Sequence, residues 1–419
     1  MATISKLDAT WILDSRSNPT VRCELVLDHD GKKYTAFASV PSGASTGSFE
    51  AVELRDGFAE FNGKGVSKAI NNINETIASK IRFEEFGNAL ELDEFLLDLD
   101  TTGNKSELGA NAILAVSMAS HRAFAEIAGL ELWQYLRRMY FSFLPARQKY
   151  PRLMLNIING GAHADNNLDI QEFMIIPNSE DIQESVLIGH TIFNKLKSIL
   201  KKQGFSTGVG DEGGFAPNFK SDSEALDNIR LAITESGYTY DQVLIAMDVA
   251  ATEFFNPNTK DYTFNGKKYT SPELVKYFSD LNNKYNFASI EDICAEDDII
   301  GWKEATTVLG SKVQLVGDDL FVTNINRFRV LGGEKKLGNA ILIKPNQIGS
   351  IIETCQVINK AREDGYSVVI SHRSGETSDD FISDLSYACQ SDFIKAGAPN
   401  RGERVAKYNR LLIIKHNLQ

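Results

Sequence analysis

The chain has 419 residues, a net charge of −12, and a composition that is 42% hydrophobic and 24% charged, as is typical of a folded globular protein. The acidic balance argues against specific or nonspecific nucleic-acid binding, which needs a basic face. No stretch approaches the ~20 apolar residues of a membrane span, and no signal-peptide pattern is present. The 4 cysteines are scattered and indicate reduced thiols, so a cytoplasmic location is expected.

The beginning of the chain predicts an antiparallel sheet. Residues 21–27 and 34–37 read as strands in a stretch of alternating apolar and polar side chains, and Asp28-His-Asp-Gly31 between them is typical of a hairpin turn. A loop of small residues, 41–47, follows. It is either a flexible connection or a mobile lid whose backbone and hydroxyls meet an anion or a metal.

Helices are predicted next. Residues 66–81 repeat apolar side chains at spacings of three and four, and residues 110–127 are alanine-rich, which indicates a buried packing helix. A further segment, 132–143, is aromatic and basic, and prolines interrupt the chain beyond it. We therefore expect two domains, residues 1–143 and 144–419.

The second part of the chain alternates short apolar runs with helix-length segments. Residues 153–158 and 171–176 are its first apolar runs, and residues 185–201 predict an amphipathic helix. Later apolar runs end at Asp248, at Glu291 and Asp292, at Asp318 and Asp319, at Lys344, at His372 and Arg373, and at Lys395. Buried strands that each end in polar residues predict a parallel barrel whose active face lies at the C-terminal strand ends.

Three of these strand ends carry carboxylates, namely Asp248, Glu291 and Asp318. Each close pair would cost about 4 kcal/mol at an effective dielectric of ~20, so carboxylates that converge on one face need a cation. An all-oxygen set suits Mg²⁺, whereas zinc would require histidine or cysteine. One such acid alone would more often cap a loop, but three at matching strand ends favour a metal site.

Other strand ends carry cations. Burial and neighbouring cations are expected to lower the pKa of Lys344, so that it can act as a general base. The alternative is a lysine that is permanently paired with a carboxylate. Arg373 and Ser374 suit a phosphate or a carboxylate, and Glu172 or Glu212 can supply an acid. Together these groups predict removal of a proton next to a carboxylate, followed by departure of a leaving group.

The sequence resembles the enolases along most of its length, from residue 14 to about residue 412. The motifs that carry the resemblance are Asp14–Thr20, Ser42–Gly47, Asn159–His163, Gln171–Met174, Gly210–Pro217, Met247–Ala251, Ser289–Asp292, Val316–Leu320, Leu342–Lys344 with Asn346–Gly349, Ser371–Glu376 and Ile394–Gly397. Each motif alone is weak, but their succession in one order is specific.

The resemblance implies reversible dehydration of 2-phospho-D-glycerate to phosphoenolpyruvate in glycolysis and gluconeogenesis. Lys344 would take the C2 proton, Glu212 would protonate the departing hydroxyl, and Glu172 and His163 would lie beside it. The other implied roles are Mg²⁺ binding by Asp248, Glu291 and Asp318, a second Mg²⁺ at Ser42, phosphate binding by Arg373 and Ser374, carboxylate binding by Lys395, and substrate contacts by His163, Glu172, Asp318 and His372.

The resemblance also implies a fold, a small N-terminal α+β cap followed by an eight-stranded α/β barrel with antiparallel first strands. A homodimer, in some members an octamer, is expected. Four departures stand out: Ser17 replaces a usual glycine, Ile293-Cys294 stands where a proline or glycine is common, an extra residue is placed near 331–333, and the linker 137–152 is longer and more basic. Two alternatives remain, a relative acting on another carboxylate and a non-catalytic binding protein with this fold.

Overall fold

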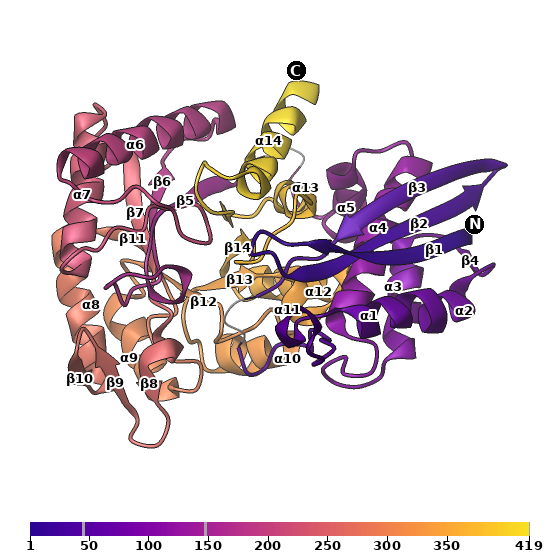
Figure 1. Cartoon of the computed structure of the whole chain (residues 1–419), viewed down its shortest axis with the longest axis horizontal. Coiled ribbons are helices and arrows are strands. Elements are labelled where there is room, and N and C mark those ends of the chain that lie inside the picture. The colour runs from indigo at the N-terminus through magenta and orange to yellow at the C-terminus, as the bar shows by residue number, and fades with distance from the viewer. Residues whose placement is uncertain (44–46, 146–148, 419) are drawn as a thin grey trace.

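The computed structural model describes residues 1–43, 47–145 and 149–418, which form a small N-terminal part beside a larger barrel (Figure 1). The N-terminal sheet has the strand order β3-β2-β1-β4 and is antiparallel. Its strands are β1 Ala2–Leu13, β2 Pro19–His29, β3 Lys32–Ser39 and β4 Glu85–Phe86. The predicted hairpin is confirmed, because His29 pairs with Lys32 and the two residues between them, Asp30 and Gly31, have φ of 50° and 73°.

Helices cover one face of this sheet (Figure 1). They are η1 Glu60–Gly63, α1 Ser67–Asn71, η2 Asn72–Ile77, α2 Ala78–Ile81, α3 Ala89–Leu99, α4 Ala110–Ile127 and α5 Leu132–Tyr140. The helix predicted over 66–81 corresponds to α1, η2 and α2, with a π-helical turn in its middle. The buried packing helix predicted over 110–127 is α4, which packs against β2 and β3.

Eight strands close the barrel, and two of its junctions, β5–β6 and β6–β7, are antiparallel while the others are parallel. The strands are β5 Arg152–Asn159, β6 Glu172–Pro177, β7 Val243–Asp248, β11 Phe287–Glu291, β12 Gln314–Gly317, β13 Ala340–Ile343, β14 Ser367–Ser371 and β15 Phe393–Lys395. The implied cap-and-barrel fold with an antiparallel start is therefore confirmed.

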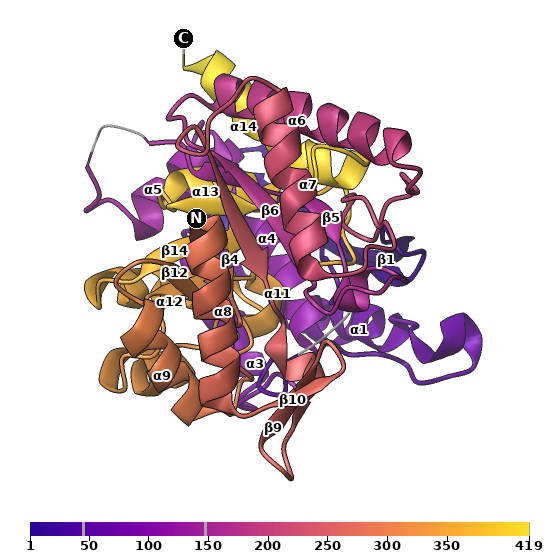
Figure 2. The same cartoon turned by 90° about the vertical axis from the view of Figure 1, so that its left-hand side faces the viewer.

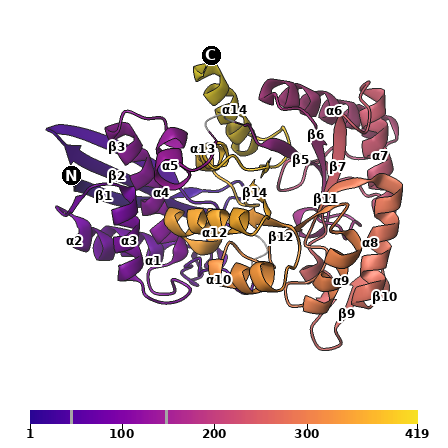
Figure 3. The same cartoon turned by 180° about the vertical axis from the view of Figure 1, so that it is seen from behind.

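The other elements surround the barrel, and a small ribbon of β8, β9 and β10 projects from one side (Figure 2). They are η3 Gly161–His163, α6 Ile182–Lys202, α7 Asp222–Glu235, η4 Ala251–Phe254, β8 Phe255–Asn256, β9 Asp261–Phe264, β10 Lys267–Tyr269, α8 Ser271–Tyr285, α9 Ile299–Leu309, α10 Ile325–Phe328, η5 Arg329–Glu334, α11 Pro345–Ile348, α12 Ile351–Glu363, α13 Phe381–Ala388 and α14 Gly402–Asn417. Seen from behind, α12 lies between the barrel and the cap, where it contacts α3 and α4 (Figure 3).

The barrel interior is filled by apolar side chains. A cluster separate from the main core contains Met154, Met174, Ile176, Ala246, Val316, Ala340, Leu342, Val369 and Phe393. These residues come from seven of the eight barrel strands, and Ala288 of β11 packs against them. Because apolar side chains fill the barrel interior, a polar active site can form only beyond the strand ends.

Ser17 is accommodated in a conformation that glycine adopts easily. Its φ is 60°, and the turn is closed by the amide of Asp14 donating to the carbonyl of Asn18 at 2.8 Å. The Asp14 carboxylate also accepts from the amides of Arg16 and Asn18 at 2.8 and 2.9 Å. Ser17 therefore adopts the left-handed backbone conformation of this turn. That conformation costs a non-glycine residue about 1–2 kcal/mol.

We expect Ser17→Gly to raise the free energy of unfolding by about 0.5–1 kcal/mol. Glycine removes the conformational cost in the folded protein, and this gain exceeds the loss that comes from the greater entropy of glycine in the unfolded chain. Chemical denaturation measures the change. Ser106→Gly, at an exposed position outside the left-handed region, is the matched control and should be destabilising. Equal destabilisation by the two variants would contradict the expectation.

The extra residue expected near 331–333 falls inside a π-helical segment, η5 Arg329–Glu334. A π turn holds one more residue than an α turn, so it absorbs an added residue without displacing the elements on either side. The connection between α5 and β5 includes residues 146–148, which lie outside the described residues. The domain boundary near residue 143 therefore stays a prediction. Across the described ranges, every helix is too short or too polar to cross a membrane.

A partly buried ion pair joins the cap to the barrel. The Arg122 guanidinium on α4 donates to both carboxylate oxygens of Asp379 at 2.7 and 2.8 Å. The amides of Ser39 and Phe381 donate to the same carboxylate at 2.9 and 3.0 Å. Burial alone would raise the pKa of Asp379, but Arg122 and these donors outweigh it and lower the pKa.

Because the pKa of Asp379 is lower in the folded protein than in the unfolded chain, its stabilisation is complete above the unfolded pKa of about 3.9 and is lost as the pH falls through the folded value. We expect Asp379→Asn to cost about 1.5–3 kcal/mol at neutral pH. The difference in unfolding free energy from the wild type should shrink below about pH 4. Denaturant titrations across pH measure it, and a difference independent of pH would refute the role of the charge.

Candidate active site

A narrow polar pocket opens at the C-terminal ends of the barrel strands. Its lining residues are His163, Gln171, Glu172, Glu212, Asp248, Ala250, Asp292, Asp318, Asp319, Lys344, Ser371, His372, Arg373, Ser374 and Lys395. The structure thus brings together all the predicted site residues except Glu291, which is buried and contacts Lys395, and Ser42. Most of these groups lie where a buried strand leaves the apolar interior, whereas His163 lies in η3 and Glu212 in the loop before α7.

Lys395 lies at the centre of one half of the pocket, where its ammonium contacts three carboxylates. The distances from its Nζ are 3.1 Å to Glu172 Oε1, 3.1 Å to Asp248 Oδ2 and 2.8 Å to Glu291 Oε2. Burial opposes the charged lysine, but these acids outweigh it and raise the pKa of Lys395 well above its ordinary value. The same burial, together with mutual repulsion among the acids, raises the pKa values of Glu172 and Glu291.

Lys344 makes an ion pair with Asp318, whose other oxygen accepts from Gln347 Nε2 at 2.8 Å. Burial favours a neutral Lys344, but the Asp318 carboxylate outweighs burial and the nearby cations, so the pKa of Lys344 is raised. The predicted lowering of this pKa is therefore wrong in this arrangement. The reason is that Asp318, which the sequence analysis assigned to a metal ion, pairs with the lysine, as the alternative interpretation allowed.

Among the described residues, two groups of side chains could hold a cation, His163 with Glu172 and Glu212, and the all-carboxylate group of Asp292, Asp318 and Asp319, whose oxygens lie within 4.8 Å of one another. Both oxygens of Asp292 accept from backbone amides, those of Asp318 and Asp319, at 2.9 Å each. Burial and like charge raise the pKa values of Asp292 and Asp319. The neighbouring Glu291 has a buried Oε1 without a hydrogen-bond partner. This all-oxygen, charge-rich set fits a hard divalent cation.

The predicted metal ligands are thus only partly grouped as expected, since Asp248 and Glu291 share the Lys395 ammonium. Asp292 and Asp319 had no assigned role. The signal that could have identified them is the pairing of adjacent acids, Glu291 with Asp292 and Asp318 with Asp319, at two strand ends.

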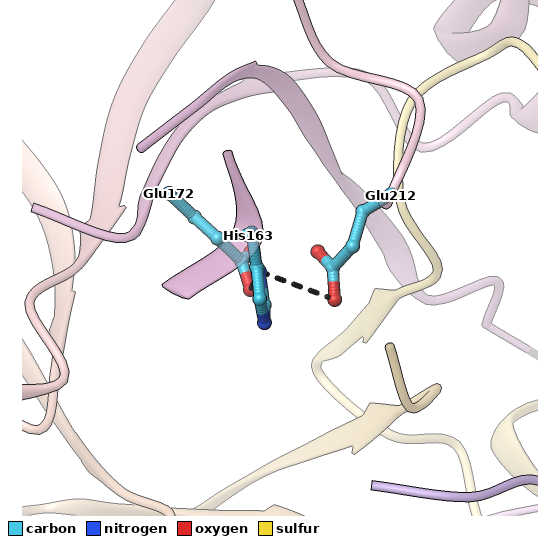
Figure 4. A group of neighbouring side chains, drawn as sticks. All are labelled: His163, Glu172 and Glu212. Carbon is cyan, nitrogen blue, oxygen red and sulfur yellow. Dashed lines mark ion pairs between the residues drawn. The ribbon is translucent and has the colours of Figure 1, made fainter. Parts of the chain in front are cut away.

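The other half of the pocket holds His163 between Glu172 and Glu212 (Figure 4). His163 Nδ1 lies 3.7 Å from Glu172 Oε1 and 3.6 Å from Glu212 Oε1. His372 Nε2 lies 3.4 Å from Glu212 Oε1, and Asn156 donates to Glu212 Oε2 at 3.0 Å. His163 is therefore not an isolated structural histidine, the interpretation that a lone histidine favours.

The pKa values of Glu172 and Glu212 are shifted in opposite directions. Burial and the charge of Glu212 raise the pKa of Glu172. Burial also opposes the charge of Glu212, but His372 and His163 outweigh it and lower the pKa of Glu212. Paired acids with separated pKa values are typical of proton-transfer sites. Burial and the neighbouring groups thus set the pKa of Glu172 above that of Glu212 in this arrangement.

Arg373 and Ser374 line the pocket beside a contact with the cap. Arg373 Nη1 lies 2.9 Å from Glu50 Oε2, and Ser42 and Gly375 exchange backbone hydrogen bonds at 2.7 and 2.9 Å. A Cβ at Gly43 would lie 1.8 Å from Arg373 Nη2, so only glycine permits this approach. The cap therefore fixes the guanidinium that was predicted to bind phosphate.

Ser42 is buried outside the pocket lining, and its hydroxyl donates to Asp14 Oδ2 at 2.6 Å. Its role at a second metal ion stays a prediction, as does the lid, because residues 44–46 lie outside the described residues. Glu50, Asn156 and Gln347, which contact Arg373, Glu212 and Asp318, were not predicted. Asn156 lies on a barrel strand and Gln347 inside a quoted motif, whereas Glu50 carried no such signal, and only the fold shows that they contact residues of the pocket.

The fold and site together define a class, a barrel enzyme with a capping domain, in which acidic and basic side chains meet in one pocket beyond the strand ends. Comparison with protein families agrees. Residues 4–136 match the family model described as the enolase N-terminal domain, and residues 148–419 match the enolase C-terminal TIM barrel domain. The chain belongs to the enolase family, and it is an enolase-superfamily lyase.

Proposed function

We propose that this protein dehydrates 2-phospho-D-glycerate to phosphoenolpyruvate, reversibly, as a glycolytic and gluconeogenic enzyme. The observation that carries the proposal is the arrangement of one pocket. On one side lies Lys344 with the acidic cluster, which consists of Asp292, Asp318 and Asp319. The Glu172–Glu212 pair lies on another side, and Arg373 with Ser374 lies at the edge. A base, an acid and an anion clamp around one small space are the groups that this β-elimination needs.

Each residue then has a definite task. Arg373 and Ser374 bind the phosphate, and Lys395 binds the substrate carboxylate. Lys344 takes the proton from C2, and Glu212 gives a proton to the hydroxide leaving C3. Glu172 and His163 support Glu212 and contact the substrate. Two Mg²⁺ ions, held by Asp248, Glu291 and Asp318 and at Ser42, would neutralise the growing charge on the substrate carboxylate when bound.

Lys344 must be neutral to take the C2 proton. Whether it is neutral depends on its ion-pair partner, Asp318. While Asp318 faces the ammonium, the lysine stays protonated. A cation bound to the Asp318 carboxylate would remove this stabilisation of the charged form. Burial, Arg373 and Lys395 favour the neutral lysine, so binding of a cation at Asp318 and activation of the base would be linked. We also propose a homodimer in the cytoplasm.

The test is to mix the purified protein with 2-phosphoglycerate and Mg²⁺ and to follow the ultraviolet absorbance of the enol phosphate product. We expect product formation that stops when a chelator is added and returns with excess Mg²⁺. Absence of product from folded, Mg²⁺-binding protein would contradict the proposed substrate.

We expect Asp318→Asn to raise the Mg²⁺ concentration needed for half-maximal activity by at least 10–100-fold, the loss seen even when indirect metal contacts are removed. Calorimetric Mg²⁺ titration and activity titration measure the change. Asp297→Asn, at a neighbouring acid whose side chain is 70% exposed, is the matched control and should leave both titrations unchanged. An unaltered Mg²⁺ titration for Asp318→Asn would exclude Asp318 as a ligand.

A further inference from the structure

Arg404, on the C-terminal helix α14, has a fully buried guanidinium that touches two walls of the pocket from behind. It donates to the carbonyls of Arg373 and Ser374, both at 2.6 Å, and to the carbonyl of Asp211 at 3.0 Å. A buried guanidinium is retained only when hydrogen bonds satisfy its donors. Arg404 thus links the loop that carries the anion clamp to the loop that carries the acid.

The same guanidinium determines which nitrogen of His372 carries the proton. Arg404 Nη1 lies 2.7 Å from His372 Nδ1. A guanidinium has donors only and keeps its charge, so Nδ1 must be the acceptor. A neutral imidazole with an acceptor at Nδ1 carries its hydrogen at Nε2, the atom that lies 3.4 Å from Glu212 Oε1.

Protonation of both ring nitrogens is disfavoured at this position. Burial is the main cause, because it disfavours the charged imidazolium. The Glu212 carboxylate favours the charged form and the Arg404 charge disfavours it, and together these effects lower the pKa of His372 to about 3. His372 is therefore a neutral donor over the working pH range. Nε2 makes no hydrogen bond in this structure, but its hydrogen lies close enough to Glu212 Oε1, at 3.4 Å between the heavy atoms, to stabilise the carboxylate that remains after Glu212 has given up a proton.

We propose that Arg404 is a positioning residue, which locks His372 in its Nε2–H tautomer and so makes Glu212 a stronger proton donor. The role in catalysis rests on the proposed function, whereas the tautomer does not. Without Arg404, the Nδ1–H form becomes accessible, and its Nε2 lone pair would face the Glu212 carboxylate. The wrong tautomer of a catalytic histidine costs about 10⁴ in kcat in serine proteases, where the histidine itself transfers the proton. Since His372 acts through Glu212, we expect a smaller loss, about 10–10²-fold.

The first measurement is the tautomer of His372 in the wild-type protein, by two-dimensional ¹⁵N NMR of histidine-labelled protein, with the signal assigned by its loss in His372→Gln. We expect an unprotonated Nδ1 and a protonated Nε2 that do not change between pH 6 and 8. A protonated Nδ1 would overturn the proposal. This result holds whether or not the protein turns over 2-phosphoglycerate, so the tautomer and the proposed function can fail separately.

The second measurement uses three variants. Arg404→Met should shift His372 toward a mixture of tautomers and lower kcat by about 10–10²-fold, with a smaller change in KM. Arg404→Lys keeps a cationic donor and should recover the Nε2–H signal and part of kcat, even if the methionine variant folds poorly. Lys415→Gln removes the same charge from the same helix at a surface pair with Asp181 and should change neither readout. An Nε2–H signal and kcat that both persist in folded Arg404→Met would refute the assignment.

Discussion

Replacement of Lys344 by alanine is expected to lower kcat by about 10²–10⁴, the usual contribution of a general base, while Mg²⁺ binding is largely retained. Lys344 is the lysine at the end of β13, and its ammonium faces the acidic cluster inside the pocket. Removing it also frees Asp318 from its ion pair, so metal affinity has no reason to fall. Steady-state kinetics with 2-phosphoglycerate and a calorimetric Mg²⁺ titration measure the two quantities.

Lys303→Ala, at an exposed position on α9, is the control and should retain wild-type kcat. Near-normal turnover by Lys344→Ala would exclude Lys344 as the base. A loss of Mg²⁺ binding equal to the loss of activity would instead indicate that the lysine acts by organising the acids.

Replacement of Lys407 by methionine is expected to lower the free energy of unfolding by about 3–5 kcal/mol, since it leaves a buried carboxylate without its counter-charge. Lys407 on α14 lies 2.6 Å from Glu376 Oε2 and donates to the carbonyl of Thr377 at 2.7 Å. Its side chain is 1% exposed and that of Glu376 is 4% exposed. Urea denaturation followed by circular dichroism measures the loss.

The double variant Lys407→Met with Glu376→Gln separates charge from packing. It should be more stable than Lys407→Met alone, because no unpaired buried charge remains. A single variant that loses less than about 1 kcal/mol would show that water or another group satisfies Glu376.

Much of the fold could be predicted because its signals are local. The hairpin around Asp30, the helix α4 and the strand runs each follow from a period or a turn within a few residues. The strand-end rule of parallel barrels then predicted many of the side chains that meet in one pocket, although Glu291 lies outside the lining and His163 and Glu212 come from segments between strands and helices. The antiparallel junction of β5 and β6 was expected from the family resemblance and from the lack of a helix between them.

The partners within the site could not be predicted in the same way. A strand-end position says that Lys395 points toward the pocket, but the balance among Glu172, Asp248 and Glu291 depends on distances of a few tenths of an ångström. Arg404 and Lys407 were missed because the residues they hold are about 30 positions or more away, and a helical period marks such residues as ordinary surface or packing positions.

The lysines that lie among the pocket acids have a consequence for how the protein depends on its metal. Lys395 contacts Glu172, Asp248 and Glu291, and Lys344 contacts Asp318, so two ammonium groups offset part of the charge of four acids. Small zinc domains unfold when they are demetallated, since no other group balances their ligands. Here the lysines of the polypeptide supply part of the counter-charge. On the proposed magnesium dependence, removal of the metal should therefore stop the reaction while the fold stays intact, so that activity returns when magnesium is added back.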